Sequence, residues 1–442
     1  MNIIKVIFLL KIKFFSRIII RYKELLKIQT LSIKQLEILN FEKRKAIVTY
    51  AYHNIPFYKE YYDNNSFNPA YLITENDWHK VPFVTKALLK ENGNKIINPY
   101  FSKSKLKSST TGGSTGTPLK VYFDKNIPLE AFGWRTMSWW GISPWENQAY
   151  VYRNVRKGIG QILNTLMWWP TKRTLLDCSS MSSSNIEKFI EDINRIKPSF
   201  IQGYVGGIYD FSKFVNDNKI KIHKPKAVWV TAAPLPDSTR NFIESSLKAP
   251  VYDQYGCSEM FWLAAECKMR SGLHVLSDIR HIEFVDLEGN IVNTGQEGDV
   301  VITDLENKAF PIIRYKNGDS GKYFKNQVCS CGLPFPLIDK IKGRVTDNIK
   351  TPSGISINGS YLTTIFDDLT ELVEGFQIIQ HKDYSISLNC ILSKGKSSDN
   401  IGFNKILNEL REKSNNEINI TLNFQDSLIQ DRGKLKFVIS EL

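Results

Sequence analysis

The sequence turns on one run of small polar residues, Ser108-Ser109-Thr110-Thr111-Gly112-Gly113-Ser114-Thr115-Gly116-Thr117-Pro118. Ten of these eleven residues are serine, threonine or glycine, and the apolar segment 119–123 follows directly. Glycines let the backbone approach a ligand closely, and amide and hydroxyl groups together bind phosphate oxygens. The spacing matches neither the Walker A loop nor Gly-x-Gly-x-x-Gly. A solvated linker is the alternative, but the Thr-Pro pair and the apolar segment favour a phosphate-binding loop.

The composition is that of an ordinary globular protein. The chain has 442 residues, of which 42% are hydrophobic and 12% aromatic, and this length predicts two or three domains. Its net charge of +13 suits a polyphosphate substrate, an anionic membrane or nucleic acid. No helix-turn-helix or RNA-binding motif is recognisable, so nucleic acid is not expected as a partner. Six cysteines are too few for a disulfide scaffold, which predicts a reducing, cytoplasmic location.

The first 60 residues predict a basic, helical N-terminal segment. Residues 1–25 contain one acid, Glu24, and six bases, which are Lys5, Lys11, Lys13, Arg17, Arg21 and Lys23. The apolar runs are too short to span a bilayer, and no signal-peptide cleavage site follows. Two interpretations remain. We favour a helix packed on the main domain with its lysines in water, and the alternative is an amphipathic helix in peripheral contact with the anionic inner leaflet.

From the Ser/Thr/Gly run to about residue 341, short apolar segments alternate with amphipathic ones. Residues 149–152, 226–230 and 300–303 are apolar and predict strands, whereas residues 186–197 and 238–247 have helical periodicity. This alternation of strands and helices indicates an α/β architecture, in which helices form layers on sheets. No internal repeat is visible.

Three further segments carry groups suited to binding a nucleotide. Residues 251–259 end an apolar strand in Gly-Cys-Ser-Glu, which offers a hydroxyl and a carboxylate to a Mg²⁺–phosphate group. Residues 310–319 end in Asn-Gly-Asp, and an aspartate there suits hydrogen bonds from ribose hydroxyls. Residues 341–350 are short, charged and bounded by glycine, as a hinge between domains would be. A helix cap or an ordinary turn explains such segments equally well when each is taken alone.

Four of the six cysteines lie between Cys257 and Cys331. Cys267 and His274 are seven residues apart, and the motif Cys329-Ser330-Cys331-Gly332 brings two thiols close together. Three cysteines and one histidine can form a tetrahedral zinc site, and four protein ligands indicate a structural role because no position stays open. Reduced side chains that share no metal are the alternative. A Cys-x-Cys-Gly motif in a cysteine-poor chain disfavours that alternative.

A smaller C-terminal domain is predicted, with its boundary between residues 343 and 344. Helices are expected over residues 362–372 and 401–414, and strands over residues 385–392, 418–422 and 436–439. This is an α+β module of about 95 residues, within the usual size range of a domain. The predicted organisation is therefore an α/β domain over residues 1–343, followed by an α+β domain over residues 344–442.

The order of these segments resembles that of the adenylate-forming acyl-CoA synthetase superfamily. The Ser/Thr/Gly run is followed in turn by Tyr255-Gly256-Cys257-Ser258-Glu259, Arg314-Tyr315-Lys316-Asn317-Gly318-Asp319, Gly343-Arg344-Val345-Thr346-Asp347 and Gly433-Lys434. The resemblance covers nearly the whole chain from residue 54. It is nearest to the phenylacetate–CoA ligase branch and the related CapK-like enzymes of capsule polysaccharide biosynthesis. It implies a large multi-sheet adenylation domain followed by a small, mobile lid domain.

The resemblance also implies which residues bind ATP. The Ser/Thr/Gly run would hold the β- and γ-phosphates through Ser109, Thr110, Thr111, Gly112, Gly113, Thr115, Gly116 and Thr117. The other nucleotide-binding residues would be Ala232, Ala233 and Pro234 at the adenine, Tyr255 against the adenine, Gly256 and Ser258 in the same motif as Tyr255, Asp319 at the ribose, and Arg344 nearby.

Three residues are implied to take part in catalysis. Glu259 would hold Mg²⁺, Thr111 would act within the phosphate loop, and Lys434 would stabilise the charge that develops during adenylation. Similar proteins with the same Cys–His–Cys–Cys pattern look zinc-binding, which implies a structural Zn²⁺ on Cys267, His274, Cys329 and Cys331.

Two positions depart from the family pattern. Ala233 stands where the adenine turn usually has an acidic residue. In the hinge motif, Thr346 precedes a single Asp347, where two aspartates are common. Nucleotide binding stays compatible with both departures, which bear instead on how the lid domain would rotate.

The implied activity is ATP-dependent activation of a small carboxylic acid. The carboxylate would form acyl-AMP and pyrophosphate, and a thiol, coenzyme A by resemblance, would then take the acyl group. Transfer to an amine or a sugar, transfer of AMP itself, and a non-catalytic nucleotide-binding protein are the alternatives. Membership in the capsule-associated branch would imply acyl supply for a surface polysaccharide. The acyl pocket is expected near residues 202–207, with Trp139 or Trp140, and aryl, aliphatic and amino acids all stay open as substrates.

Overall fold

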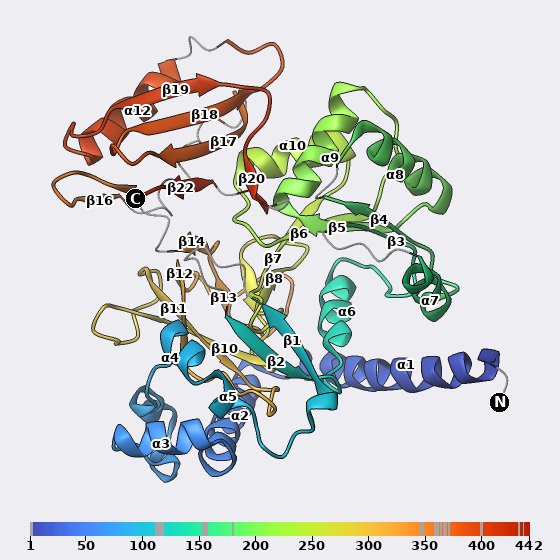
Figure 1. The fold of residues 1–442 in the computed structure, drawn as a ribbon, viewed down its shortest axis with the longest axis vertical. Helices are drawn as coiled ribbons and strands as arrows, with labels where there is room; N and C mark the ends of the chain where they lie inside the picture. The colour runs from blue at the N-terminus through green and yellow to red at the C-terminus, as the bar shows by residue number, and fades with distance from the viewer. Residues whose placement is uncertain are drawn as a thin grey trace. The chain divides into compact units, whose positions relative to one another are not determined.

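Two units that are interleaved in sequence make up the structure, a computed structural model (Figure 1). Unit 1 comprises residues 1–141 and 254–341, and unit 2 comprises residues 142–253 and 342–442. Each unit is therefore built from two separate stretches of chain. The residues that the structure describes are 3–110, 119–152, 158–178, 181–344, 349–357, 362, 365, 369, 372–397, 401–431, 434, 435 and 437–442.

The first stretch of unit 1 is mostly helical, and the second is made of short strands. The first contains α1 (Ile3–Ile28), α2 (Ile33–Asn54), α3 (Pro56–Asn64), η1 (Pro69–Tyr71), η2 (Glu75–Lys80), α4 (Lys86–Glu91), α5 (Gly93–Ile96), η3 (Lys103–Lys105), β1 (Leu106–Thr110), β2 (Lys120–Asp124) and α6 (Leu129–Trp139). The second contains β8 (Ala264–Glu266), β9 (Leu273–Val275), β10 (Arg280–Val285), β11 (Gly298–Asp304), β12 (Tyr315–Gly321) and β13 (Leu337–Ile338). Antiparallel pairing joins β10 to β11 and β11 to β12, and likewise β8 to β9 and β9 to β13.

Helix α1 packs against α6 within unit 1. Phe15, Ile18 and Leu25 are buried, and the ring of Phe15 stacks on Trp134 of α6 at 6.3 Å between ring centroids. Arg21 donates to Glu306 at 2.8 Å, which fixes the helix by charge as well as by apolar contact. This packing agrees with the interpretation favoured from the sequence. Among the described residues, no helix has both the length and the apolar character that crossing a bilayer requires.

A buried ion pair joins three segments of unit 1. Arg314 donates through Nη2 and Nε to the two carboxylate oxygens of Glu283, at 2.9 and 3.2 Å, and both side chains are almost inaccessible to solvent. Its Nη1 donates to the carbonyls of His79 and Val81. The indole of Trp78 donates to Glu283 at 2.8 Å. Buried charges are tolerated when they are paired and their remaining donors are satisfied, and this network fulfils both conditions.

The first stretch of unit 2 is a parallel α/β layer. Its elements are β3 (Gln148–Tyr152), α7 (Ile159–Trp168), β4 (Arg173–Asp177), α8 (Ser183–Ile196), β5 (Phe200–Tyr204), α9 (Val205–Asp217), β6 (Ala227–Thr231), α10 (Asp237–Leu247) and the start of β7 (Val251–Tyr255), whose last two residues belong to unit 1. The strand order is β7-β6-β5-β3-β4. The crossovers through α8, α9 and α10 advance toward β7, whereas the crossover through α7 runs the other way. Right-handed crossovers therefore place α8–α10 on one face of these strands and α7 on the other, as Figure 1 shows.

The second stretch of unit 2 forms a small α+β module. Its elements are β14 (Lys342–Arg344), β15 (Ile349–Lys350), β16 (Ser356–Ile357), β17 (Val373–Gln380), β18 (Ile386–Leu392), α12 (Ile401–Lys413), β19 (Ile420–Phe424), β20 (Gln430–Asp431), β21 (Lys434–Leu435) and β22 (Val438–Ser440). A four-stranded sheet has the order β19-β18-β17-β22. Phe376, Leu388, Phe403 and Leu410 are buried together, so α12 and this sheet share one core.

The structure confirms the predicted mixed α/β fold with a large multi-sheet part and a small C-terminal module. Each apolar segment predicted as a strand contains a strand. The helices predicted over residues 186–197, 238–247 and 401–414 correspond to α8, α10 and α12, with ends that differ by a few residues. The helix predicted over residues 362–372 lies mostly outside the described residues. The domain boundary after residue 343 stays a prediction.

We expect Glu283→Ala to destabilise the protein strongly, because it would leave the Arg314 guanidinium buried without a counter-charge. Breaking a buried pair on one side costs about 3–5 kcal/mol, which a lower urea midpoint of unfolding would report. Asp63→Ala is the matched control, since it breaks the exposed pair with Lys59 at 3.0 Å and should leave the midpoint unchanged. Equal midpoints for both variants would contradict the importance of the buried pair.

Candidate nucleotide site and metal centre

The turn that follows β7 is built around a glycine. Tyr255 is the last residue of β7, and a Cβ on Gly256 would lie 1.8 Å from the carbonyl oxygen of Phe261. Only glycine fits such an approach. The amide of Gln254 donates to the carbonyls of Tyr255 and Phe261, at 2.7 and 3.2 Å, and holds the turn closed. The turn carries Ser258, which is partly buried, and Glu259, which is 4% exposed.

A bulge in β12 lies in the segment 310–319, the second segment predicted to bind a nucleotide. Lys316 pairs with Val301 and Ser320 pairs with Asp299, so β12 has two more residues than β11 between the pairs. Gly318 has φ +84°, which the extra residues require and which glycine adopts without strain. Bulges redirect side chains at functional sites, and here the bulged residues include Asn317 and Asp319.

The bulge and the end of β7 meet through hydrogen bonds. The hydroxyl of Tyr255 donates to Oδ2 of Asp319 at 2.7 Å, and the amide of Asn317 donates to the same oxygen at 2.7 Å. Burial, and next the negative charge of Asp319, raise the pKa of Tyr255 well above its ordinary value. The phenol therefore keeps its proton and stays a donor at neutral pH. The Asp319 carboxylate is held in one orientation by neighbours that remain neutral.

The carboxylate of Glu259 lies in the same part of unit 1. The hydroxyl of Tyr315, which begins β12, donates to Glu259 at 3.1 Å. Burial raises the pKa of Cys257 well above its ordinary value, and the negative charges of Glu259 and Asp319 raise it further. These two carboxylates thus create a negative potential between β7 and β12. A buried carboxylate in a negative site is a donor set that suits a hard cation such as Mg²⁺.

Five of the residues predicted to bind the nucleotide lie together in unit 1, and the others belong to other elements or lie outside the described residues. Unit 1 gathers Tyr255, Gly256, Ser258, Glu259 and Asp319. Of the remaining predicted residues, Ser109 and Thr110 end β1, the adenine turn Ala232-Ala233-Pro234 follows β6 in unit 2, Arg344 ends β14, and Lys434 begins β21 opposite Asp431. Thr111, Gly112, Gly113, Thr115, Gly116 and Thr117 lie outside the described residues, as do Thr346 and Asp347 of the predicted hinge. The roles of all these residues stay predictions.

Two polar contacts at this site were not assigned from the sequence. Asn317 orients Asp319, and Tyr315 orients Glu259. Both residues lie in the motif Arg314–Asp319, which drew attention only to its aspartate. The sequence feature that could have identified them is their spacing, because Asn317 and Tyr315 lie two and four residues before Asp319 and alternate residues of a strand tend to share a face.

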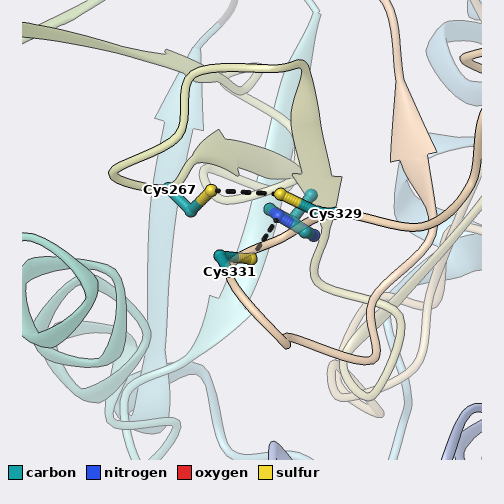
Figure 2. Close-up of side chains that lie close together, drawn as sticks. Cys267, Cys329 and Cys331 are labelled. Carbon is teal, nitrogen blue, oxygen red and sulfur yellow. Dashed lines mark hydrogen bonds between the residues drawn. The ribbon is translucent and has the colours of Figure 1, made fainter.

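The predicted metal ligands converge in unit 1 (Figure 2). The ligand atoms of Cys267, His274, Cys329 and Cys331 all lie within 4.8 Å of one another. The Sγ atoms of Cys267 and Cys329 are 3.7 Å apart, and Sγ of Cys331 is 3.3 Å from Nε2 of His274. A tetrahedral zinc ion with Zn–S bonds of about 2.3 Å sets its sulfur ligands about 3.8 Å apart. The spacing therefore fits a tetrahedral metal.

Local structure explains how two distant segments supply these ligands. Cys267 directly follows β8, and His274 lies in β9, which pairs with β13 through Leu337. The loop before β13 contains a tight turn in which the N–H of Gly332 donates to the carbonyl of Cys329. Gly332 has φ +79°, which accounts for glycine in the Cys-x-Cys-Gly motif.

The surroundings of the ligands also suit a metal. The carbonyl of Phe335 lies 3.1 Å from Nδ1 of His274, so Nδ1 carries the proton and Nε2 is directed to the metal position. Backbone N–H groups of Met269 and Leu333 donate to the sulfurs of Cys267 and Cys331. Burial raises the pKa of Cys331 to about 12 and lowers that of His274. The histidine is thus neutral, as a ligand must be, and a bound Zn²⁺ would displace the thiol protons.

We expect the purified protein to hold about one equivalent of zinc, as a closed four-ligand site does. Cys329→Ser should reduce this content to near zero and lower the thermal midpoint, because the remaining buried thiols lose their common cation. Elemental analysis of the purified wild type and of the variant measures their zinc contents. Cys178→Ala is the matched control, since Cys178 is also buried but lies in unit 2 outside the cluster. Zinc retained in full by Cys329→Ser would exclude these ligands.

The chain is similar to two groups of proteins. Residues 349–441 match the family model described as the CapK C-terminal domain. Protein CapK of Staphylococcus aureus is 23% identical over 418 residues, which span 91% of this chain and 89% of CapK. The phenylacetate–coenzyme A ligase of Thermus thermophilus is 23% identical over 81% of each chain.

The fold is also that of a solved ligase. A 2-hydroxyisobutyryl-CoA ligase in complex with an acyl-AMP superimposes with a TM-score of 0.75 at 18% identity, over 94% of this chain and 91% of the ligase. At this identity the likeness shows the fold alone, and it agrees with the motif order in the sequence. The chain is therefore a homologue of CapK and of the phenylacetate–coenzyme A ligases.

Proposed function

We propose that this protein is an ATP-dependent, AMP-forming ligase that converts a carboxylic acid to acyl-AMP and then to an acyl thioester of coenzyme A. Its phenylacetate–coenzyme A ligase relatives and its fold support an enzyme of this kind. The observation that carries the proposal is the arrangement in unit 1. The end of β7 and the bulge of β12 present a buried Glu259 and an oriented Asp319.

Each of these two carboxylates has a proposed partner in ATP. Asp319 would accept hydrogen bonds from the ribose hydroxyls, since Tyr255 and Asn317 hold it in place. Glu259 would hold Mg²⁺, which when bound neutralises phosphate charge. Thr111 and the rest of the Ser/Thr/Gly run would bind the β- and γ-phosphates, and Lys434 would approach the reacting phosphate.

The proposed reaction has two balanced steps. A carboxylate oxygen of the substrate attacks the α-phosphorus of ATP, the bond from this phosphorus to the bridging oxygen breaks, and pyrophosphate leaves. The thiolate of coenzyme A then attacks the acyl carbon, the acyl–phosphate bond breaks, and AMP leaves. The protein supplies position and charge, since such displacements need little covalent assistance.

The proposed biological role of the enzyme rests on its similarity to CapK. Similarity to CapK over most of both chains supports a role in surface or capsular polysaccharide biosynthesis, at 23% identity. In that role an amine or a sugar could replace coenzyme A as the acyl acceptor. We propose a cytoplasmic enzyme because both ATP and coenzyme A are cytoplasmic substrates.

Pyrophosphate exchange into ATP, dependent on an added carboxylic acid, tests the first step. With Mg²⁺ and a panel of aryl, aliphatic and amino acids, we expect exchange with one class of acid. Glu259→Gln should lower the exchange rate about 100-fold or more, because the metal contributes several kcal/mol to such reactions.

Glu288→Gln is the control for that substitution, since Glu288 is an exposed acid of the same unit. It should leave exchange unchanged. Exchange that survives in Glu259→Gln would refute the role of Glu259, and a wild-type protein that does not bind ATP would refute the enzyme assignment. Coenzyme A or an amine is then added to the accumulated acyl-AMP. The compound that causes release of AMP is the acyl acceptor.

Tyr255→Phe should raise the KM for ATP about tenfold, because the hydrogen bond that orients a charged group is lost. The maximal exchange rate should change little, since the hydroxyl lies away from the reacting phosphate in this assignment. Tyr323→Phe is the matched control, because Tyr323 also donates a hydrogen bond, to the carbonyl of Ile282 at 2.7 Å. An unchanged KM in Tyr255→Phe would argue against a nucleotide at Asp319.

A further inference from the structure

The helix α7 (Ile159–Trp168) turns its apolar side toward solvent. It has no charged residue, and four large apolar side chains are exposed: Ile159 (77%), Ile162 (61%), Leu163 (52%) and Leu166 (47%). At 100° per residue these four lie within about a third of the helix circumference. The helix α8 of the same unit does the opposite and buries its apolar side, Ile186, Phe189, Ile190 and Ile193. We refer to the four exposed side chains of α7 as the apolar stripe.

The opposite side of α7 attaches the helix to unit 2. Trp168 lies about 180° from the centre of the apolar stripe. The guanidinium of Arg173 lies 4.3 Å from the ring centroid of Trp168 and 4.5 Å from that of Tyr150 in β3. The helix is therefore held through Trp168 and Arg173, and the outward direction of the apolar stripe follows from this attachment. In the described part of unit 2, α7 is also the crossover helix on its face of the parallel strands.

The sequence around α7 carries only positive charge. Between Glu146 and Asp177 there is no acidic residue, and there are five basic ones: Arg153, Arg156, Lys157, Lys172 and Arg173. These residues flank the helix on both sides in sequence. A tryptophan pair, Trp168-Trp169, ends the helix, and Trp169 is 69% exposed. Apolar side chains on one face, tryptophan at the end and bases at both flanks are the properties of helices that lie in the interface of an anionic bilayer.

We propose that α7 seats the protein on an anionic membrane surface, with the apolar stripe immersed in the headgroup and acyl boundary. A second copy of the chain is a poorer occupant, since stable protein interfaces involve about 20–30 residues on each side and the stripe has four. Basic flanks would also repel those of a second copy, whereas phosphate headgroups attract them. The proposal is independent of the proposed activity, because no residue of α7 belongs to the nucleotide site.

Flotation of the full-length protein with lipid vesicles tests this inference. The wild type should float with vesicles of phosphatidylcholine and phosphatidylglycerol, and far less with phosphatidylcholine alone. The double variant Ile162→Ser/Leu166→Ser should bind the anionic vesicles at least about tenfold more weakly, because two immersed side chains are lost. Lys172→Gln should weaken binding about fivefold, as one base near an anionic surface does.

A matched double variant controls for loss of apolar surface in general. Leu287→Ser/Ile73→Ser removes two side chains that are 89% and 73% exposed in unit 1, and it should float like the wild type. All replaced side chains are exposed, so thermal midpoints and pyrophosphate exchange in solution should not change. If the α7 variant floats like the wild type, lipid contact lies elsewhere, for example on α1, and the proposal is wrong. If wild-type protein does not float but is a dimer that the α7 variant disrupts, the occupant is a second copy and the proposal is also wrong.

Discussion

The ion pair between Glu283 and Arg314 is the contact on which the geometry of unit 1 depends. It joins β10 to the residue that directly precedes β12, and Arg314 also binds the carbonyls of His79 and Val81. Arg314 has φ +46°, an unfavourable conformation for a side chain with a Cβ. Such strain persists where surrounding contacts determine the position strongly. The start of β12 is fixed in this way, and with it the bulge that brings Asp319 to Tyr255.

A metal bound by Cys267, His274, Cys329 and Cys331 would constrain the same region from its other end. Cys267 and His274 follow the turn that carries Glu259, and Cys329 and Cys331 follow β12. A metal that joins these segments would limit the motion of both sides of the candidate nucleotide site without touching the nucleotide. Loss of such a metal would therefore lower the stability of the candidate nucleotide site as well as that of the metal site. With a metal bound, the segments that carry the two carboxylates would be held at both ends.

Sequence reasoning predicted the α/β class, the small C-terminal module and the clustering of Cys267, His274, Cys329 and Cys331, because each has a strong local signal. Periodicity identified β3 and α8, and cysteine spacing identified Cys329 and Cys331. The Glu283–Arg314 pair could not be predicted, since its partners are 31 residues apart and neither stands out among other charges. The interleaving of the two units was also missed, because chain order alone does not show which stretches pack together. The bulge at Gly318 was visible only as an ordinary turn, although its glycine was the correct signal.

The interleaved order of the two units has a consequence for how the chain folds as it is made. Trp78 and Glu283 form a buried hydrogen bond across 205 residues of sequence. During synthesis, the helices in the first stretch of unit 1 therefore keep apolar side chains uncovered while the α/β layer of unit 2 is translated. Contacts of such high sequence separation slow folding and expose intermediates to aggregation. An amino-terminal fragment that stops before residue 283 would lack the carboxylate that accepts the hydrogen bond of the buried Trp78 indole, so we infer that unit 1 completes its fold only after its second stretch has been made.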